Sequence, residues 1–179
     1  MPFVFSQIFA FVALVCIFIA FQCKNKAALL VWNALTNFCL AISYVFLSDW
    51  VGVALLSVAT VRCVCFFFLR KYEANLHISL SVSCLLLFLI IHCVATTLLW
   101  ETWFDFVLLG GIMFLTYGLW AKGNNLVRVA TVLYATLMII HNTSVNNWAA
   151  LSVDIVTIIA IAVYYLHRTI LKAKQRKLQ

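Results

Sequence analysis

Two ionisable side chains lie inside long apolar stretches of the sequence. Arg62 is near the middle of "SVATVRCVCFFF", and Asp154 lies within "AALSVDIVTIIA". If these stretches span a membrane, a charge near mid-helix costs roughly 2.5–3.5 kcal/mol, so it should face the protein interior and have a partner. We therefore predict that Arg62 and Asp154 form an intramembrane ion pair, directly or through one water.

Two interpretations of this ion pair stay open. It can fix how two groups of helices dock, or it can belong to a charged pocket that takes up a polar solute or a proton. His141 and Asn142 lie at about the depth of Asp154 in the predicted helices, and Tyr44 lies at the equivalent place in an earlier helix. We expect these side chains to line a vestibule, with Arg62 beneath it.

The other reactive residue types form no catalytic or metal-binding pattern. The sequence shows no HExxH motif, no pair of carboxylates and no nucleophile beside a base, so we expect no catalytic residues, no enzyme activity and no cofactor. The seven cysteines are odd in number and lie in or at the ends of predicted helices. Cys63 and Cys65 project to different sides of one helix, so we expect packing residues rather than metal ligands.

The elements that must position these residues follow from the composition. Of the 179 residues, 66% are hydrophobic and 9% are charged, whereas a soluble domain is about half apolar and a quarter charged. This composition predicts an integral membrane protein and leaves no room for a soluble domain. A membrane-spanning helix needs about 20 apolar residues. The apolar runs predict spans at 3–22, 27–47, 51–69, 78–99, 104–121, 129–146 and 149–167.

Basic residues gather at one end of these spans. Eleven of the 12 lysines and arginines fall in or beside the first, third and fifth connections or after the last helix. The opposite end carries only Asp49, Glu101 and Asp105. The positive-inside rule then places the N-terminus outside and the C-terminus in the cytoplasm. The net charge of +7 is explained by this topology, and we expect no binding to nucleic acid. The N-terminal stretch lacks a basic n-region and a cleavage site, so we expect it to be a retained helix.

When the sequence is shifted by 98 residues, ends of predicted helices in the first half of the chain align with ends of predicted helices in the second half. Trp50 then aligns with Trp148 in the turns at one end. Arg70 aligns in the same way with Arg168, where the third and seventh helices end. In this arrangement the third and seventh helices can face each other across a pseudo-axis, which would bring Arg62 toward Asp154.

We therefore predict an all-α membrane protein whose seven transmembrane helices form two parallel three-helix repeats joined by a linker helix. The predicted units are a first repeat at 1–77, a linker helix at 78–100, a second repeat at 101–168 and a basic cytoplasmic tail at 169–179. Parallel repeats related by an axis along the membrane normal occur in the SWEET sugar transporters, and the architecture resembles that class. The chain departs from it because Pro2 is the only proline, so proline hinges and the "PQ" signature are missing.

Four short motifs suggest a more specific resemblance. They are "SVATVRCV" in the third helix, "VRVATV" and "MIIHN" in the sixth, and "LSVDIV" in the seventh. Taken in this order, they are similar to the YgjV-like bacterial inner-membrane proteins. The resemblance implies a multi-pass protein of the bacterial inner (plasma) membrane and a fold, but it implies no activity, because no biochemical function is established for that family.

Three classes of function remain. The repeat and the buried charges favour a carrier or channel for a small polar solute. The missing proline hinges favour a non-transporting scaffold or a receptor-like binding protein. No residue pattern favours an intramembrane enzyme. Our working hypothesis is the carrier or channel, with the lipid bilayer and a small polar solute as its partners. The identity of the solute and the oligomeric state do not follow from the sequence.

Overall fold

The structure is a computed structural model that describes residues 2–23, 25–72, 78–100, 102–121, 123–144 and 148–176. These residues form seven α-helices and no strand, which confirms the predicted all-α fold. The helices are α1 (Pro2–Gln22), α2 (Lys26–Leu47), α3 (Trp50–Lys71), α4 (Ile78–Leu99), α5 (Phe104–Trp120), α6 (Asn124–Ser144) and α7 (Trp148–Arg176).

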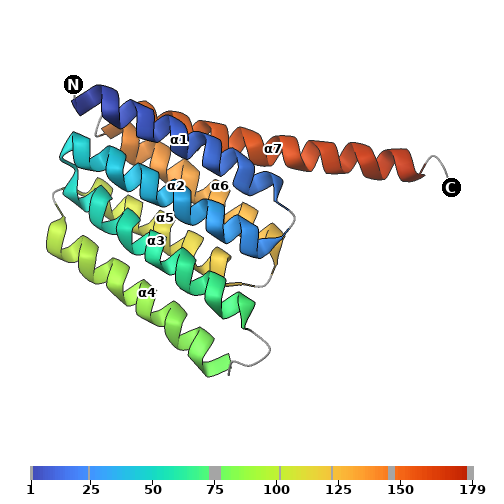
Figure 1. The fold of residues 1–179 in the computed structure, drawn as a ribbon, viewed down its shortest axis with the longest axis horizontal. Helices are drawn as coiled ribbons and strands as arrows, with labels where there is room; N and C mark the ends of the chain where they lie inside the picture. Colours follow the sequence, from blue (N-terminus) through green and yellow to red (C-terminus); the bar gives the residue numbers. More distant parts are fainter. Residues whose placement is uncertain are drawn as a thin grey trace.

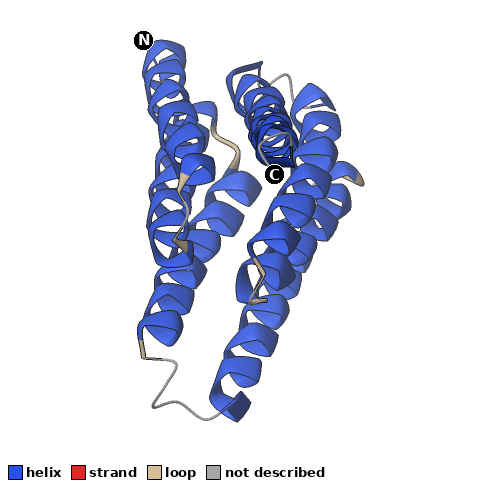
Figure 2. Cartoon of the chain, turned by 90° about the vertical axis from the view of Figure 1, so that its right-hand side faces the viewer, coloured by secondary structure: helices blue, strands red, loops and turns tan. Residues whose placement is uncertain are grey.

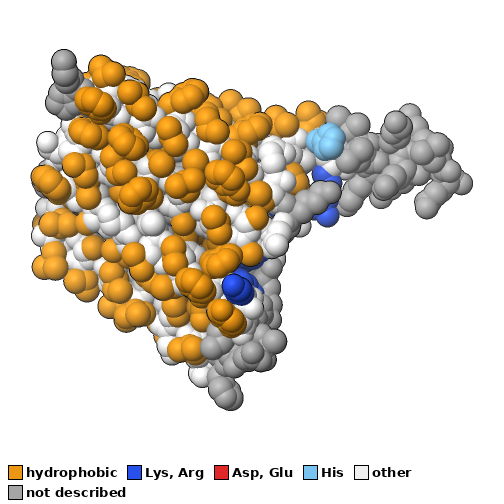
Figure 3. All heavy atoms as spheres, in the orientation of Figure 1, with side chains coloured by type: hydrophobic (Ala, Val, Ile, Leu, Met, Phe, Trp, Pro, Cys, Tyr) orange, Lys and Arg blue, Asp and Glu red, His pale blue; other side chains and the backbone are white. Residues whose placement is uncertain are grey.

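The outer surface of this bundle matches a bilayer rather than water. Six of the described helices are long and apolar enough to cross a membrane, and α5 is a shorter apolar helix of 17 residues. Seventeen residues at about 1.5 Å each span about 25 Å, near the lower limit for a crossing. In the face seen in Figure 3, hydrophobic side chains cover the bundle, and the described lysines and arginines lie at the end from which α7 projects. The chain is therefore a multi-pass membrane protein.

The helices are arranged in two layers (Figures 1 and 2). One layer holds α1, α2 and α3 side by side, and the other holds α7, α6, α5 and α4 in that order. Across the layers, α1 packs against α7, and α3 packs against α4 and α5. Sequential helices run antiparallel, so α1, α3, α5 and α7 all begin at the end of the bundle that holds the N-terminus. We call this the N-terminal end.

This arrangement corrects one expectation about how the helices meet. The third and seventh helices were expected to face each other, but α3 packs mainly against α2, α4 and α5, whereas α7 packs against α1 and α6. The reason is that each layer is a row with α2 or α6 between two neighbours. As a result, the third helix of each predicted repeat packs against the first helix of the other repeat. α3 packs against α5 and α7 packs against α1, and α3 and α7 do not face each other.

Two helix boundaries also differ from the predicted spans. α6 begins at Asn124 rather than at 129, and α7 continues to Arg176 rather than ending at 167. The predicted tail 169–179 is thus helical through Arg176. Apolar runs mark the part of a helix that crosses the bilayer, whereas lysine, arginine, glutamine and alanine also sustain a helix in water. At about 1.5 Å per residue, the 29 residues of α7 extend about 43 Å, and Figure 1 shows the helix projecting beyond the bundle.

Two apolar clusters fill the space between α3 and the second layer. Toward the N-terminal end, Leu55 and Ile112 belong to one cluster. Toward the other end, Phe66 and Leu119 belong to a second, in which Phe66 meets Phe88 edge to face at 5.9 Å between ring centroids. Along α3 and α5, the polar residues described below lie between these two clusters.

Candidate functional site

Sixteen polar or charged side chains are buried in the described part of this apolar bundle. Together with Tyr44, which is also buried, some of them form two groups between the layers. The tyrosine cluster consists of Tyr44, Asn142 and Asp154, toward the N-terminal end. The arginine cluster consists of Arg62 and Thr116, deeper in the bundle. The buried polar side chains are Ser6, Asn33, Thr36, Asn37, Ser43, Arg62, His92, Thr96, Asp105, Thr116, Arg128, Thr131, His141, Asn142, Asp154 and Thr157.

The tyrosine cluster links the two layers through a directional chain of hydrogen bonds. The Tyr44 hydroxyl of α2 donates to Asn142 Oδ1 of α6 at 2.7 Å. Asn142 Nδ2 in turn donates to Asp154 Oδ2 of α7 at 2.8 Å. All three residues are buried. The asparagine amide is suited to the middle of this chain because it offers both an acceptor and a donor. Three of the predicted vestibule residues are thus brought together.

The turn between α2 and α3 explains the position of Tyr44. Ser48 ends α2 in the left-handed conformation at φ 60°, and its N–H bonds back to Tyr44 O. Asp49 then caps α3 by accepting a hydrogen bond from Gly52 N at 2.9 Å. A Cβ on Gly52 would lie 3.0 Å from two ring atoms of Tyr44. Glycine at position 52 therefore lets the tyrosine ring lie against the first turn of α3.

His141 was expected to line the same vestibule, but its described contacts are with the start of α5. Its Nδ1 lies 3.3 Å from Phe104 O and 4.0 Å from Asp105 Oδ1. Asp105 is itself buried, and its Oδ2 accepts a hydrogen bond from Thr102 N at 2.9 Å. The sequence had placed Asp105 only among the acids at one end of the spans. In the described part of the chain, Asp105 is a second buried carboxylate beside Asp154.

Arg62 has no exposed surface, and its contacts differ from the prediction. Its Nη1 donates to Thr116 Oγ1 of α5, and the threonine hydroxyl donates to Ile112 O at 2.6 Å. In the described part of the chain, no hydrogen bond or ion pair joins Arg62 to Asp154. The predicted direct ion pair is not formed because α3 packs on α5, whereas α7 packs on α1 and α6. Tyr134 lies within electrostatic range of both charges.

Three functional candidates were missed by the sequence analysis. His92 is fully buried in α4, where its Nδ1 donates to Phe88 O at 2.6 Å. The sequence contained the feature that singled out Arg62, because His92 is also an ionisable residue inside an apolar run. Arg128 is 2% exposed, and its guanidinium carbon lies 3.7 Å from the centroid of the Tyr164 ring. Arg128 was assigned to a connection because α6 was predicted to begin after it. Thr116 gave no signal, since threonine is common in apolar helices.

The chemistry available here is hydrogen bonding and charge. Among the described residues, no group of three or more histidines, cysteines or acids is placed to hold a metal ion. The seven cysteines are free thiols. Asn37 Nδ2 contacts the Cys63 sulfur across α2 and α3 at 3.7 Å. The arrangement can therefore bind and orient a polar or charged group.

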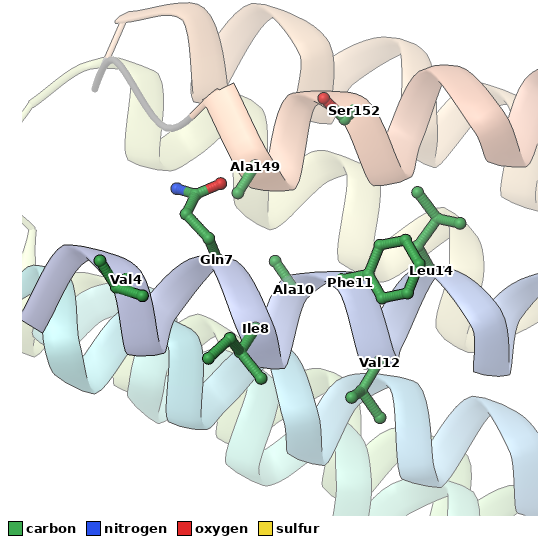
Figure 4. A pocket seen from close by; sticks show the side chains of 9 residues that line it. All are labelled: Val4, Gln7, Ile8, Ala10, Phe11, Val12, Leu14, Ala149 and Ser152. Carbon is green, nitrogen blue, oxygen red and sulfur yellow. The ribbon is translucent and has the colours of Figure 1, made fainter.

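A separate groove lies where α1 meets α7 (Figure 4). Its lining includes the exposed side chains of Val4, Ile8 and Phe11, and only Gln7 and Ser152 are polar. Ser152 donates its hydroxyl hydrogen to Trp148 O in its own helix at 2.9 Å. A groove of this composition faces the apolar surroundings of the bundle and does not offer the polar groups that a soluble solute needs.

Seven apolar helices that bury charged and polar side chains between two layers define a polytopic membrane protein. A family model described as a bacterial inner membrane protein, Imp-YgjV, matches residues 4–172. The chain therefore belongs to the Imp-YgjV family, as its motifs predicted. No curated protein and no solved structure matches the chain.

Proposed function

We propose that this protein is a carrier or channel for a small polar solute, which it moves between its two helix layers. The observation that carries the proposal is the tyrosine cluster, a buried chain of hydrogen bonds that runs from α2 through α6 to α7. Polar and ionisable side chains are costly inside a bilayer, and where they occur they usually mark a path for a solute or a proton.

A polar stripe along α6 supports passage through the bundle rather than a shallow pocket. Arg128, Thr131 and Asn142 are buried on α6, and Tyr134 is partly buried between them. The 14 positions from Arg128 to Asn142 correspond to about 21 Å along the helix axis. This distance covers most of a hydrocarbon core of about 30 Å.

The proposed orientation has the N-terminus outside and the C-terminus in the cytoplasm. Arg70 and Lys71 lie in the last turn of α3, and the end of α7 has the sequence "RTILKAKQR". Because α3 and α7 run in the same direction, both basic ends lie on one side of the bundle. The positive-inside rule assigns that side to the cytoplasm.

One observation favours the alternative of a non-transporting scaffold or receptor-like binder. The three side chains of the tyrosine cluster bond to one another, so they can hold the layers together without a solute. Buried polar groups that satisfy each other often serve only to specify packing.

Uptake by purified protein in liposomes tests the proposal. We expect uptake of at least one member of a panel of labelled sugars, amino acids and small anions. Tyr44→Phe should reduce this uptake because it removes the hydroxyl at the head of the chain. Tyr117→Phe is the matched control, since Tyr117 is 51% exposed on α5 and should not contribute. Ligand stabilisation without uptake would support a binding protein, and neither effect would support a scaffold.

A further inference from the structure

We propose that one edge of the Arg62 guanidinium binds a small monocarboxylate. For its role in transport this inference rests on the proposed function, and it then names the solute class. The binding itself does not depend on transport. Arg62 is 0% exposed, so the anion would enter a site enclosed by the helices.

The three nitrogen atoms of the Arg62 guanidinium differ in whether they have a hydrogen-bond partner. Nη1 donates to Thr116 Oγ1, whereas Nε and Nη2 have no hydrogen-bond partner among the described residues, although the buried Cys63 thiol lies close to the guanidinium. Nε and Nη2 donate from the same edge of the planar guanidinium, with their N–H bonds nearly parallel. This edge matches the two oxygens of a carboxylate, which arginine commonly binds in a bidentate manner. We call this unpartnered edge the open edge, and its two donors have the fork geometry that a planar anion requires.

The described acids of the chain do not fill this fork. Asp154 accepts a hydrogen bond from Asn142 in the tyrosine cluster, and Asp105 accepts one from Thr102 at the start of α5. Asp49 caps α3 at the N-terminal end of the bundle. A buried charged donor without a partner costs free energy, so an external anion is favoured to occupy the site.

The surroundings favour a small anion with one charge. The Arg62–Thr116 contact lies between the apolar cluster of Leu55 and Ile112 and that of Phe66 and Leu119. In such surroundings a charge-assisted hydrogen bond is stronger than in water, but any excess charge is expensive. One guanidinium neutralises one carboxylate, so a monoanion leaves no net charge at the site.

His92 of α4 carries another buried polar atom without a partner among the described residues. A carbonyl oxygen only accepts, so His92 Nδ1 carries the hydrogen that it donates to Phe88 O. The other ring nitrogen, Nε2, is buried and has no partner in the described part of the chain. The His92 ring lies within electrostatic range of Arg62. In this tautomer Nε2 is a hydrogen-bond acceptor, so the carboxylate itself would be held by the guanidinium edge alone.

Thermal unfolding of the purified full-length protein in detergent tests the proposal. The probe is sodium acetate, with sodium chloride at equal ionic strength and uncharged acetamide as comparisons. A ligand present at about 100 times its Kd should raise the Tm of a protein of this size by about 5–10 °C. We expect this rise with acetate only. An equal rise with chloride or acetamide would overturn the proposal, and so would no rise with acetate at saturating concentration.

Three variants assign the effect to the open edge. Arg62→Lys keeps the charge but cannot offer two parallel donors, so the acetate shift should be lost or strongly reduced. Arg62→Met removes the unpaired charge, should fold at least as stably as the wild type, and should show no acetate shift. Arg70→Lys is the matched control, because Arg70 is an arginine of the same helix but lies in its last turn, where it donates to Trp120 O. An unchanged acetate shift in Arg62→Met would refute the assignment.

The outcomes separate this proposal from the proposed function. An acetate shift that depends on Arg62 but comes without uptake would keep the anion site and reject the carrier. Uptake of an uncharged solute, with no acetate shift in any variant, would keep the carrier and reject the anion site.

Discussion

Replacing Tyr44 by phenylalanine should weaken the connection between the two helix layers without disturbing their packing. The substitution keeps the ring that lies against Gly52 and removes only the hydroxyl that donates to Asn142 Oδ1 at 2.7 Å. Asn142→Leu is the stronger perturbation because it removes both hydrogen bonds of the tyrosine cluster. It removes the acceptor of the Tyr44 hydroxyl and the amide that donates to the Asp154 carboxylate.

The magnitudes follow from the number of bonds lost. A hydrogen bond between membrane helices contributes about 0.6 kcal/mol on average and up to about 1.7 kcal/mol. A buried group left without its partner costs about 1–3 kcal/mol. We therefore expect Tyr44→Phe to lower the free energy of unfolding by about 1–2 kcal/mol and Asn142→Leu by about 2–4 kcal/mol. The double variant should be less destabilised than the sum, by about 0.6–1.7 kcal/mol.

The measurement is reversible unfolding by sodium dodecyl sulfate in mixed micelles, followed by circular dichroism, for the wild type, both single variants and the double variant. Tyr117→Phe controls for the loss of a tyrosine hydroxyl, because Tyr117 is exposed, and it should stay within about 0.5 kcal/mol of the wild type. A double variant whose loss equals the sum within about 0.3 kcal/mol would refute the bond between the layers.

Three further results are expected from the same structure. Gly118→Ala should destabilise by about 1–3 kcal/mol in the same assay, since its new Cβ would overlap the Ala130 Cβ, whereas Gly110→Ala meets open space and should be tolerated. Arg62→Leu and Asp154→Leu should be additive, because neither side chain contacts the other, and a coupling above about 0.5 kcal/mol would show that the charges meet. Reporter fusions should place the α2–α3 connection outside and the end of α7 in the cytoplasm; a cytoplasmic signal from that connection would contradict the proposed orientation.

The seven helices could be predicted because each contains a continuous apolar run that is bounded by polar residues. The α2–α3 turn was located well, since Asp49 is both the break in the apolar pattern and the cap of α3. The start of α6 and the end of α7 were predicted poorly for one physical reason. Hydropathy reports where a helix meets lipid, whereas backbone hydrogen bonding decides where it ends, and α7 continues through lysines and arginines to Arg176.

The tyrosine cluster could be anticipated in part, because depth in a helical membrane protein follows from the distance to the helix end. Tyr44, Asn142 and Asp154 lie at similar depths, and the structure joins them. Depth does not reveal which helices are neighbours. The pairing of Arg62 with Asp154 relied on the third and seventh helices facing each other across a pseudo-axis, and α3 and α7 do not pack that way. The partner it missed, Thr116, lies on α5. Only the order of the helices within the two layers makes that contact possible.

The contact between Tyr44 and Asn142 also bears on the proposed repeat. These two residues are 98 positions apart, which is the shift that aligns the halves of the sequence. Residues related by a two-fold axis can touch only close to that axis, so the bond supports an axis that passes between α2 and α6. The same axis would relate the packing of α1 on α7 to that of α5 on α3, and both contacts occur.

Asp154 and Arg62 have no charged counterparts at the positions that this axis would relate to them. The position aligned with Asp154 is Leu56, and the position aligned with Arg62 is Ala160, and both of these apolar residues are buried. In the proposed repeat, the carboxylate would belong to one half and the guanidinium to the other, each without a charged counterpart. A charge inside a bilayer is costly, and the repeat does not account for a charge that is present in only one half. Arg62 and Asp154 are therefore the positions at which the proposed solute path should be tested first.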